Sequence, residues 1–319
     1  MLIFKFPHQD QLYKLDRSCG DTQYNLHSFD GNERLDFRGK MVAITKQEIE
    51  NIEFELPEND FHHAEESQAE YLKKIEKTVE IIQQNKLKKL VIARKKIVDY
   101  ATIDFPNSFL NLCKKYPSAF VYAFSEHNLA WMGAFSEALG IYDKKTKKFQ
   151  TMSLAGTLPI AENWSQKEIE EQQPVSDYIL DVLKSYSKTV EQSQTYDHPS
   201  GNIKHLRTDF SIEIEEEHVQ NLLQDLHPTP AVCGIPKDIC QEKILELEGF
   251  SREFYAGYSR IETEDFLYSF VNLRCAKFYT DHAEIFVGGG ITKDSSPEKE
   301  WQETELKSLA IINNLVINR

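Results

Sequence analysis

The sequence predicts an α+β fold whose sheets are largely antiparallel, and two observations lead to this prediction. Helical and strand-like segments are mixed without the regular strand–helix–strand alternation of a parallel sheet. Strand-like segments also follow one another between residues 119 and 154 with only turns between them, which is typical of antiparallel hairpins. The length of 319 residues allows one large domain or two ordinary ones.

The first half of the chain begins with a polar, turn-rich region that contains strand-like pieces at residues 41–45 and 52–56. Apolar residues then recur at helical spacing, so residues 64–84 are predicted to form an amphipathic helix. The other elements expected in this half are a strand at 89–98, a short helix at 105–115, and strands at 119–124, 129–134, 137–143 and 149–154.

The second half begins with a long helix, predicted at residues 165–189 from its apolar stripe. Residues 192–207 show no periodicity and are predicted to be a loop. Pro297 favours the first turn of a final helix. The elements expected after the loop are helices at 215–226 and 236–247, strands at 267–278 and 284–287, and the final helix at 297–316.

The net charge excludes a simple nucleic-acid-binding protein. Lys and Arg number 37 against 51 Asp and Glu, which gives −14, whereas a phosphate-binding surface needs clustered cations. The dense lysine cluster at residues 144–148 is instead predicted to be a solvated hairpin tip.

Hydropathy and cysteine spacing predict a cytoplasmic protein that does not act at a membrane. No apolar run approaches the roughly 18 residues of a membrane span, and the N-terminus has too few apolar residues for a signal-peptide core. The cysteines lack metal-binding spacing, so we expect free thiols in a reducing compartment. They are Cys19, Cys113, Cys233, Cys240 and Cys275.

Acidic residues on two predicted helices are candidate ligands for a hard cation. Glu300, Glu303 and Lys307 project from one face of the final helix, and Glu168 and Glu171 share a face of the helix at 165–189. Carboxylate oxygens are the ligands that Mg²⁺ prefers. The same spacing is also typical of a solvated helix surface, and the pattern does not show that the two faces meet.

Two glycine-containing segments and one proline-rich loop are candidate binding elements. Glycines 288–290 follow an apolar strand, where a bare backbone can present N–H groups to an anion. The run is also consistent with a strand-ending turn, and residues 155–157 give a similar but weaker signal. Two prolines around Thr229 make the loop at 226–231 rigid, which suits either a binding site or a structural corner.

Taken together and in this order, a series of motifs resembles the chorismate-utilising enzyme family, and is most like its isochorismate synthase branch. Lys89 favours this branch, because the branches that use ammonia do not place a lysine there. The resemblance covers roughly residues 64–316. The motifs lie at residues 89–94, 133–134 with Glu137, 154–157, 171 with 175, 226–231, 255–257, 271–274, 288–291, and 300–304 with Lys307.

The resemblance implies a single α+β domain with two packed, mostly antiparallel sheets flanked by helices. Residues 1–63 would form the N-terminal part of this domain, which is short for the family, and residues 64–319 its chorismate-binding catalytic region. The implied reaction is the Mg²⁺-dependent isomerisation of chorismate to isochorismate. Water adds at C2 of the ring, the C4 hydroxyl leaves, and the double bonds shift.

The same resemblance implies a role for each matching residue. Lys89 would be the general base toward water, which requires its pKa to fall from the ordinary value of ~10.4. Glu137 would be the general acid toward the leaving hydroxyl, with a raised pKa. The implied Mg²⁺ ligands are Glu171 and Glu303, with Glu300 close by. The implied substrate-binding residues are Arg274 and Lys307 for the enolpyruvyl carboxylate, Gly288 through its N–H, and Gly156, Thr157, His227, Thr229, Ala231 and Tyr255 in the pocket lining.

Other readings stay open at this point. A salicylate synthase, which adds pyruvate elimination to the same first step, would share these residues. A non-catalytic chorismate-binding or partner-regulating protein is a second alternative, and no glutaminase partner is expected. Isochorismate would serve either menaquinone or siderophore biosynthesis. The chain departs from the family pattern at Phe135–Ser136, at Gln172 and at the second glycine of the 288–290 run.

Overall fold

The computed structural model describes residues 1–18, 20–58, 65–200 and 203–318. Within these residues, 17 strands form one hydrogen-bonded sheet, which folds at β4 (Arg34–Ile44) into two layers. Residues 40–44 of β4 pair with β2 (Leu12–Asp16), while its residues 34–39 pair with β3 (Thr22–His27). Every strand pairing is antiparallel within this part of the chain, as the sequence predicts.

The first layer lies between β4 and the short strand β14. In hydrogen-bonding order from the outer edge, its strands are β14 (Gly234–Ile235), β5 (Lys89–Asp99), β18 (His282–Ile291), β17 (Cys275–Phe278), β8 (Leu129–Phe135), β7 (Phe120–Glu126), β1 (Leu2–Lys5), β2 and β4.

The second layer continues from the other half of β4. Its strands are β3, β15 (Tyr258–Glu262), β16 (Phe266–Val271), β9 (Ala138–Asp143), β10 (Lys148–Pro159) and β13 (Ile203–Glu213), with β11 (Glu191–Gln192) and β12 (Tyr196–Ser200) both pairing with β13. A separate pair joins β6 (Thr102–Ile103) to β19 (Ile317–Asn318).

The main core lies between the two layers, and strand alternation builds it. Phe120, Tyr122 and Phe124 point from β7 into this core, while Val121 between them faces a second core on the outer side of the first layer. The ring of Phe120 stacks on Phe270 of the second layer at 4.7 Å between centroids. Aromatic stacking therefore holds the two layers together.

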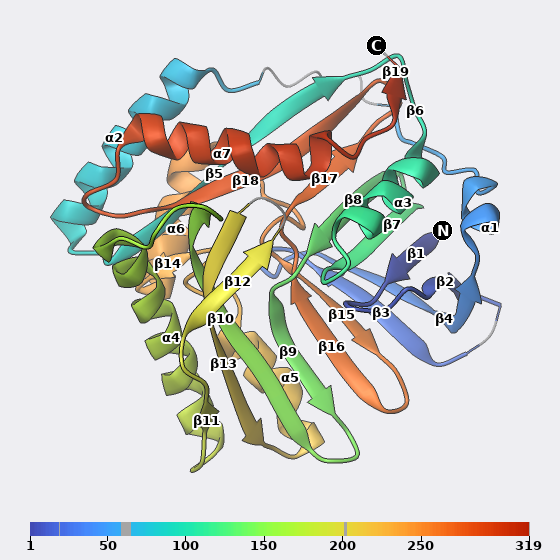
Figure 1. The fold of residues 1–319 in the computed structure, drawn as a ribbon, viewed down its shortest axis with the longest axis horizontal. Helices are drawn as coiled ribbons and strands as arrows, with labels where there is room; N and C mark the ends of the chain where they lie inside the picture. Colours follow the sequence, from blue (N-terminus) through green and yellow to red (C-terminus); the bar gives the residue numbers. More distant parts are fainter. Residues whose placement is uncertain (19, 59–64, 201–202, 319) are drawn as a thin grey trace.

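Helices cover the outer faces of both layers (Figure 1). Two of them, α2 and α7, lie side by side over β5 and β18, whereas α4 and α5 pack on the second layer. No helix in the described ranges is long and apolar enough to cross a membrane. The helices are α1 (Lys46–Glu50), α2 (Gln68–Asn85), α3 (Phe105–Lys115), α4 (Gln166–Tyr186), α5 (Glu216–Leu226), α6 (Lys237–Glu248) and α7 (Pro297–Ile312).

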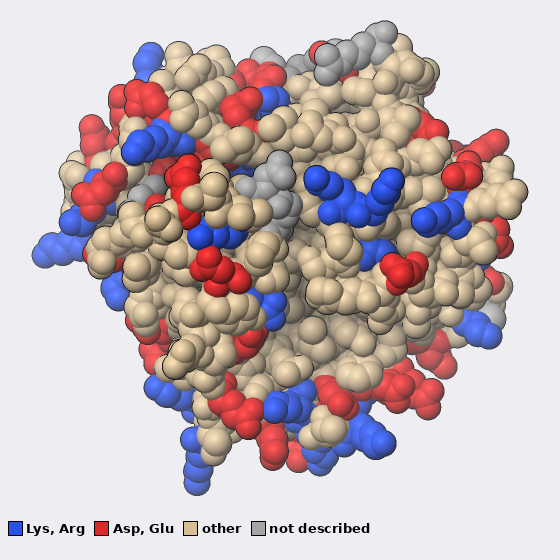
Figure 2. Space-filling model, in the orientation of Figure 1, with Lys and Arg blue, Asp and Glu red and all other residues tan. Residues whose placement is uncertain are grey.

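The lysine cluster at 144–148 forms a solvated hairpin tip, as predicted. The turn joins β9 to β10, and its lysines pair with glutamates, including Lys144 with Glu262 at 2.8 Å and Lys147 with Glu215 at 2.7 Å. Figure 2 shows acidic and basic side chains interspersed at this lower rim. The cysteines at 113, 233, 240 and 275 are free thiols, as expected, and Cys19 lies outside the described residues.

Three of the sequence predictions were wrong. Residues 52–56 form no strand, because Ile52, Phe54 and Leu56 pack their alternate apolar side chains against the second core without a pairing partner. The predicted loop at 192–207 instead contains β12 and the first part of β13. The predicted strand at 267–278 is divided into β16 and β17, which belong to different layers.

The glycine run also differs from a strand-ending turn. Gly288, Gly289 and Gly290 are paired within β18, opposite Ala93, Ile92 and Val91 of β5. The strand therefore presents bare backbone directly beside the start of β5.

Candidate active site

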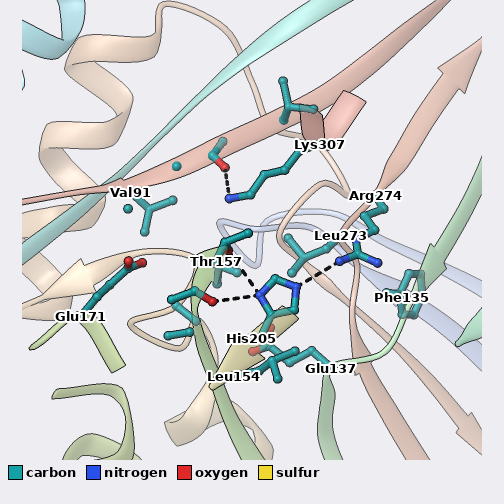
Figure 3. A pocket seen from close by; sticks show the side chains of 18 of the residues that line it. Val91, Phe135, Glu137, Leu154, Thr157, Glu171, His205, Leu273, Arg274 and Lys307 are labelled. Carbon is teal, nitrogen blue, oxygen red and sulfur yellow. Dashed lines mark hydrogen bonds between the residues drawn. The ribbon is translucent and has the colours of Figure 1, made fainter. Parts of the chain in front are cut away.

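A cavity of about 120 Å³ lies where β5 and β18 of the first layer approach β10 and β13 of the second (Figure 3). Predicted site residues that line it are Lys89, Glu137, Gly156, Thr157, Glu171, Ala231, Tyr255, Arg274, Gly288 and Lys307. The other lining residues are Val91, Phe135, Ser136, Leu154, Ala155, His205, Val232, Leu273, Phe286, Val287, Gly289 and Gly290.

Lys89 and Glu171 meet at one side of this cavity. Lys89 is the first residue of β5 and is 2% exposed, and its Nζ lies 2.9 Å from Oε1 of Glu171 on α4. A buried amine of this kind needs such a partner, because a polar group without a hydrogen-bond partner in the interior costs free energy. The structure thus brings together two residues to which the resemblance gives different roles.

The glycine run makes room for this pair. A Cβ atom on Gly290 would lie 2.7 Å from Glu171 Oε1 and 2.9 Å from Lys89 Nζ, both too close for a real contact. A Cβ on Gly288 would lie 2.9 Å from the carbonyl oxygen of Ile92 and 3.0 Å from the hydroxyl of Tyr255. The side chains of the site therefore pack directly on the backbone of β18.

Glu137 is the second titratable group buried in the cavity. It directly precedes β9 and is 4% exposed. Burial raises the pKa of Glu137 to about 8, and the nearby charge of Lys89 opposes that rise. The carboxyl group therefore holds a proton at pH 7 and can donate it, as a general acid must.

Arg274 and Lys307 place two cations on the cavity wall. Arg274 lies between β16 and β17 with a φ of 48°, a left-handed conformation that is uncommon for a residue with a side chain. Burial lowers the pKa of Arg274. Lys307 Nζ lies 2.9 Å from the carbonyl oxygen of Gly288 and 2.7 Å from Glu303 Oε1. Two cations on one cavity wall are suited to binding an anionic group.

His205 is a lining residue that sequence reasoning missed. Its Nδ1 lies 3.0 Å from the carbonyl oxygen of Gly156 and 3.2 Å from Thr157 Oγ1, and its Nε2 lies 3.1 Å from Nη2 of Arg274 (Figure 3). Arg274 can only donate, so Nε2 accepts and Nδ1 carries the hydrogen. Burial, with help from the Arg274 charge, lowers the pKa of His205 to about 3, which keeps the ring neutral.

A signal for the strand that carries His205 was present in the sequence, although it puts His205 on the opposite face from the apolar residues. Leu206, Phe210 and Ile212 point inward from β13 at even spacing, which is the strand period. The predicted loop at 192–207 ends before most of this alternation, so the sequence prediction assigned His205 to a loop.

The loop at 226–231 reaches the cavity only at its end. Ala231 lines the cavity together with Val232, whereas His227 and Thr229 are not among the lining residues. His227 is buried with its ring 4.9 Å from that of Tyr258, and the carbonyl of Thr229 accepts hydrogen bonds from the backbone N–H groups of the turn that follows. At these two positions the loop is a buried corner behind the site.

The predicted metal ligands occupy two helices beside the glycine run. Glu171 comes from α4, and Glu300 of α7 is 1% exposed and faces Gly289, where a Cβ would lie 3.0 Å from its Oε2. Glu303 is turned toward Lys307 and does not line the cavity. Over the described ranges, no three His, Cys, Asp or Glu side chains gather as a ready-made metal cluster.

These donors nevertheless fit Mg²⁺. The ion takes oxygen ligands, and it is commonly held by one or two carboxylates while waters and substrate oxygens complete its shell. The absent side chains at Gly289 and Gly290 form a cradle that Glu300 and Glu171 approach from α7 and α4. A pair of carboxylates beside a cavity that opens to substrate is therefore a sufficient donor set.

Gln172, one of the departures from the family pattern, has a structural role. Its side chain is 3% exposed, and its Nε2 lies within hydrogen-bond distance of Ser153 at 3.1 Å, Ser176 at 2.7 Å and Thr208 at 3.0 Å. These contacts tie α4 to β10 and β13. They hold the helix turn that presents Glu171 next to Lys89.

Comparison with known proteins shows which family the chain belongs to. The family model described as "Chorismate binding enzyme" matches residues 30–316, which is most of the chain. The chain belongs to the chorismate binding enzyme family. This result confirms the resemblance read from the motifs.

Curated relatives of this chain include several isochorismate synthases. MenF of Pasteurella multocida (strain Pm70) is 27% identical over 274 residues, which cover 79% of this chain and 62% of the relative. MenF of Escherichia coli (strain K12) is 29% identical over 209 residues, 60% of this chain and 47% of the relative. DhbC of Bacillus subtilis (strain 168) is 33% identical over 152 residues, which cover 45% of this chain and 37% of the relative. The chain thus spans less than two thirds of the length of each of these relatives.

Solved structures confirm the α+β fold. A DhbC isochorismate synthase structure from Bacillus anthracis has a TM-score of 0.81 at 20% identity, covering 98% of this chain and 95% of that chain. MenF from Escherichia coli has a TM-score of 0.79 at 19% identity, covering 98% and 88%. Anthranilate synthase component I from Streptococcus pneumoniae TIGR4 reaches 0.71 at 16% identity, covering 98% and 90%. The fold is therefore common to more than one activity, and the reaction has to be argued from the site.

Proposed function

We propose that this chorismate-binding enzyme converts chorismate to isochorismate and that the reaction requires Mg²⁺. The observation that carries the proposal is that Lys89 and Glu137 line one buried cavity that also contains the cations Arg274 and Lys307. The names of the curated relatives support the same reaction, since several are isochorismate synthases. Family membership supports chorismate as the substrate.

Arg274 and Lys307 bind and orient the substrate in this proposal. Chorismate carries two carboxylates, and the enolpyruvyl carboxylate would be held by these two cations. The hydrogen bond from Arg274 to His205 and the contact of Lys307 with the Gly288 carbonyl position both groups before the substrate arrives. Preorganised cations of this kind lose little freedom on binding, which favours both affinity and orientation.

Lys89 and Glu137 carry the two proton transfers. Lys89 Nζ takes a proton from water, and the water oxygen bonds to C2 of the ring. The double bonds shift, the bond between C4 and its hydroxyl oxygen breaks, and Glu137 gives its proton to that oxygen, which leaves as water. One water enters and one leaves, and proton exchange with solvent returns both side chains to their starting states.

Mg²⁺ would be held by Glu171 and Glu300, which approach the cradle at Gly289 and Gly290, together with Glu303 one turn further along α7. When bound, the ion supplies positive charge that neutralises the ring carboxylate of the substrate. The carboxylates of these residues are the hard oxygen donors that this role requires. Glu171 also holds Lys89 at the cavity wall, so it serves the base as well as the ion.

The product identifies the reaction. Purified protein is incubated with chorismate, with Mg²⁺ or with EDTA, and the products are identified by proton NMR. The proposal predicts isochorismate with Mg²⁺ and none with EDTA. Salicylate together with pyruvate would instead assign the salicylate synthase reaction, and chorismate binding without turnover would assign a non-catalytic role.

The names of two similar proteins point to two pathways that use such a product. One curated relative is named as vibriobactin-specific, and one solved structure is described as menaquinone-specific. We propose that isochorismate from this enzyme enters menaquinone or siderophore biosynthesis.

A further inference from the structure

A second cavity, of about 250 Å³, adjoins the active-site cavity and is called the outer cavity below. Arg274 and Lys307 line both cavities, so these two cations form a wall that the cavities share. The remaining residues of the outer cavity are Lys115, Tyr116, Ile203, Leu306, Leu309, Ala310, Asn313 and Asn314.

The outer cavity reaches the protein surface between α7 and the end of α3. Leu306 and Leu309 of α7 are 55% and 40% exposed, so this wall is open to solvent. Tyr116 follows α3 and also lines the outer cavity, with its hydroxyl 3.4 Å from the carbonyl oxygen of Ala310 on α7. The passage therefore runs from solvent to the shared cations.

Positive charge continues along this passage. Lys115 is the last residue of α3, is exposed, and lines the outer cavity. The guanidinium carbon of Arg274 lies 5.9 Å from the ring of Tyr116, the residue that follows Lys115 in the chain. Figure 2 shows Lys and Arg side chains gathered over the part of this face where α3 lies in Figure 1.

We propose that the outer cavity is the route by which the anionic substrate reaches the active site, and that Lys115 is the first cation it meets. This inference rests on the proposed function, because it takes a dianionic cyclic carboxylate as the substrate. The cations Lys115, Lys307 and Arg274 give the two carboxylates successive partners, and the exposed leucines match the apolar edge of the ring. Such a path offsets the repulsion that a chain of net charge −14 exerts on an anion.

Charge reversal at Lys115 tests the route, and Lys114 provides the matched control. Both lysines are exposed in the last turn of α3, but Lys114 does not line the outer cavity. Lys115→Glu is expected to lower kcat/KM for chorismate about 10-fold at ~0.01 M ionic strength, with kcat nearly unchanged. The loss should shrink as salt is added. Lys114→Glu should stay within about twofold of wild type. Equal effects of the two substitutions would overturn the proposal.

A steric test addresses the passage itself. Leu306→Trp fills the exposed wall of the outer cavity, and Leu245→Trp makes the same change at an exposed leucine of α6 that lines neither cavity. We expect Leu306→Trp to lower kcat/KM several-fold and Leu245→Trp to leave it unchanged. Equal kcat/KM values in these two variants would contradict access through the outer cavity.

The experiments distinguish an error in the proposed route from an error in the proposed function. If wild-type protein forms no isochorismate, the proposed function fails, and the association rate of chorismate measured by stopped-flow fluorescence still compares the four variants. If wild type turns over chorismate but Lys115→Glu matches Lys114→Glu, the route alone is wrong.

Discussion

The amine of Lys89 lies 2.9 Å from the carboxylate of Glu171, although the two residues are 82 positions apart in the chain. The contact joins the first residue of β5 to α4 at one side of the active-site cavity. It is possible because Gly290 of β18 leaves the space that a side chain would fill. The predicted base, Lys89, and a predicted metal ligand, Glu171, are therefore in direct contact.

Loss of the Lys89 amine is expected to stop catalysis. Lys89→Ala should lower kcat about 10³-fold, since a positioned general base contributes on that order. Chorismate should still bind in the presence of Mg²⁺, because Arg274 and Lys307 remain. Steady-state kinetics and calorimetry measure the two effects, with Lys88→Ala as an exposed neighbouring control. Normal turnover in Lys89→Ala would show that another group activates water.

The acid role of Glu137 predicts a pH dependence with a definite sign. Burial raises the pKa of Glu137 to about 8, so the proton-donating form is present below that pH and is lost as pH rises through it. The rate should therefore fall above about pH 8. Glu137→Gln should lower kcat by a factor on the order of 10²–10⁴ and remove this limb of the profile. An unchanged alkaline limb in Glu137→Gln would assign it to another group.

The same raised pKa predicts an effect on stability. Between the ordinary carboxyl pKa and about 8, folded protein keeps a proton on Glu137 that unfolded protein has released. Wild type should therefore lose stability relative to Glu137→Gln as pH rises, by about 2 kcal/mol between pH 5.5 and 7. Urea unfolding at the two pH values measures the difference. A gap that does not change with pH would mean that Glu137 is ionised in the folded protein.

Two alanine substitutions in the glycine run distinguish steric displacement of Lys89 and Glu171 from the general effect of replacing a glycine in β18. Gly290→Ala places a methyl group against Lys89 and Glu171, and should lower kcat at least 10-fold by displacing them. Gly289→Ala meets only Glu300 Oε2, at 3.0 Å, and should act more weakly on kcat. Kinetics on variants with matched thermal unfolding make the comparison. A larger loss of kcat in Gly289→Ala would contradict the packing described for Lys89.

Removal of one α7 carboxylate is expected to alter metal dependence. Glu303→Gln should raise the Mg²⁺ concentration for half-maximal activity about 10-fold or more, whereas Glu298→Gln, an exposed residue in the first turn of the same helix, should not. Activity titrated with Mg²⁺ measures both. Identical titrations for Glu303→Gln and wild type would remove Glu303 from the metal site.

Much of the fold follows from local patterns in the sequence. The helix at Phe105–Lys115 has the bounds that the sequence predicts. The strand at Lys89–Asp99 extends only one residue beyond its prediction. These elements are predictable because their periodicity reflects burial on one face. The motif resemblance likewise placed Lys89, Glu137 and Arg274 on one site, and all three line the same cavity.

Other features depend on contacts between distant segments and have no local pattern. The division of residues 267–278 into two strands occurs at Arg274, whose left-handed backbone turns the chain from one layer to the other. Glu303 pairs with Lys307 on its own helix, whereas Glu300 turns toward Gly289. Helical spacing puts all three on one face and does not distinguish their partners.

Isotope incorporation tests the central claim most directly. Wild-type enzyme is incubated with chorismate and Mg²⁺ in water enriched in oxygen-18, and the isochorismate formed is examined by mass spectrometry. If Lys89 adds solvent water at C2 while Glu137 releases the C4 hydroxyl, each product molecule gains one oxygen-18 atom in its ring hydroxyl. Unlabelled isochorismate would mean that the hydroxyl moves without exchange with solvent, and it would contradict the roles assigned to both residues.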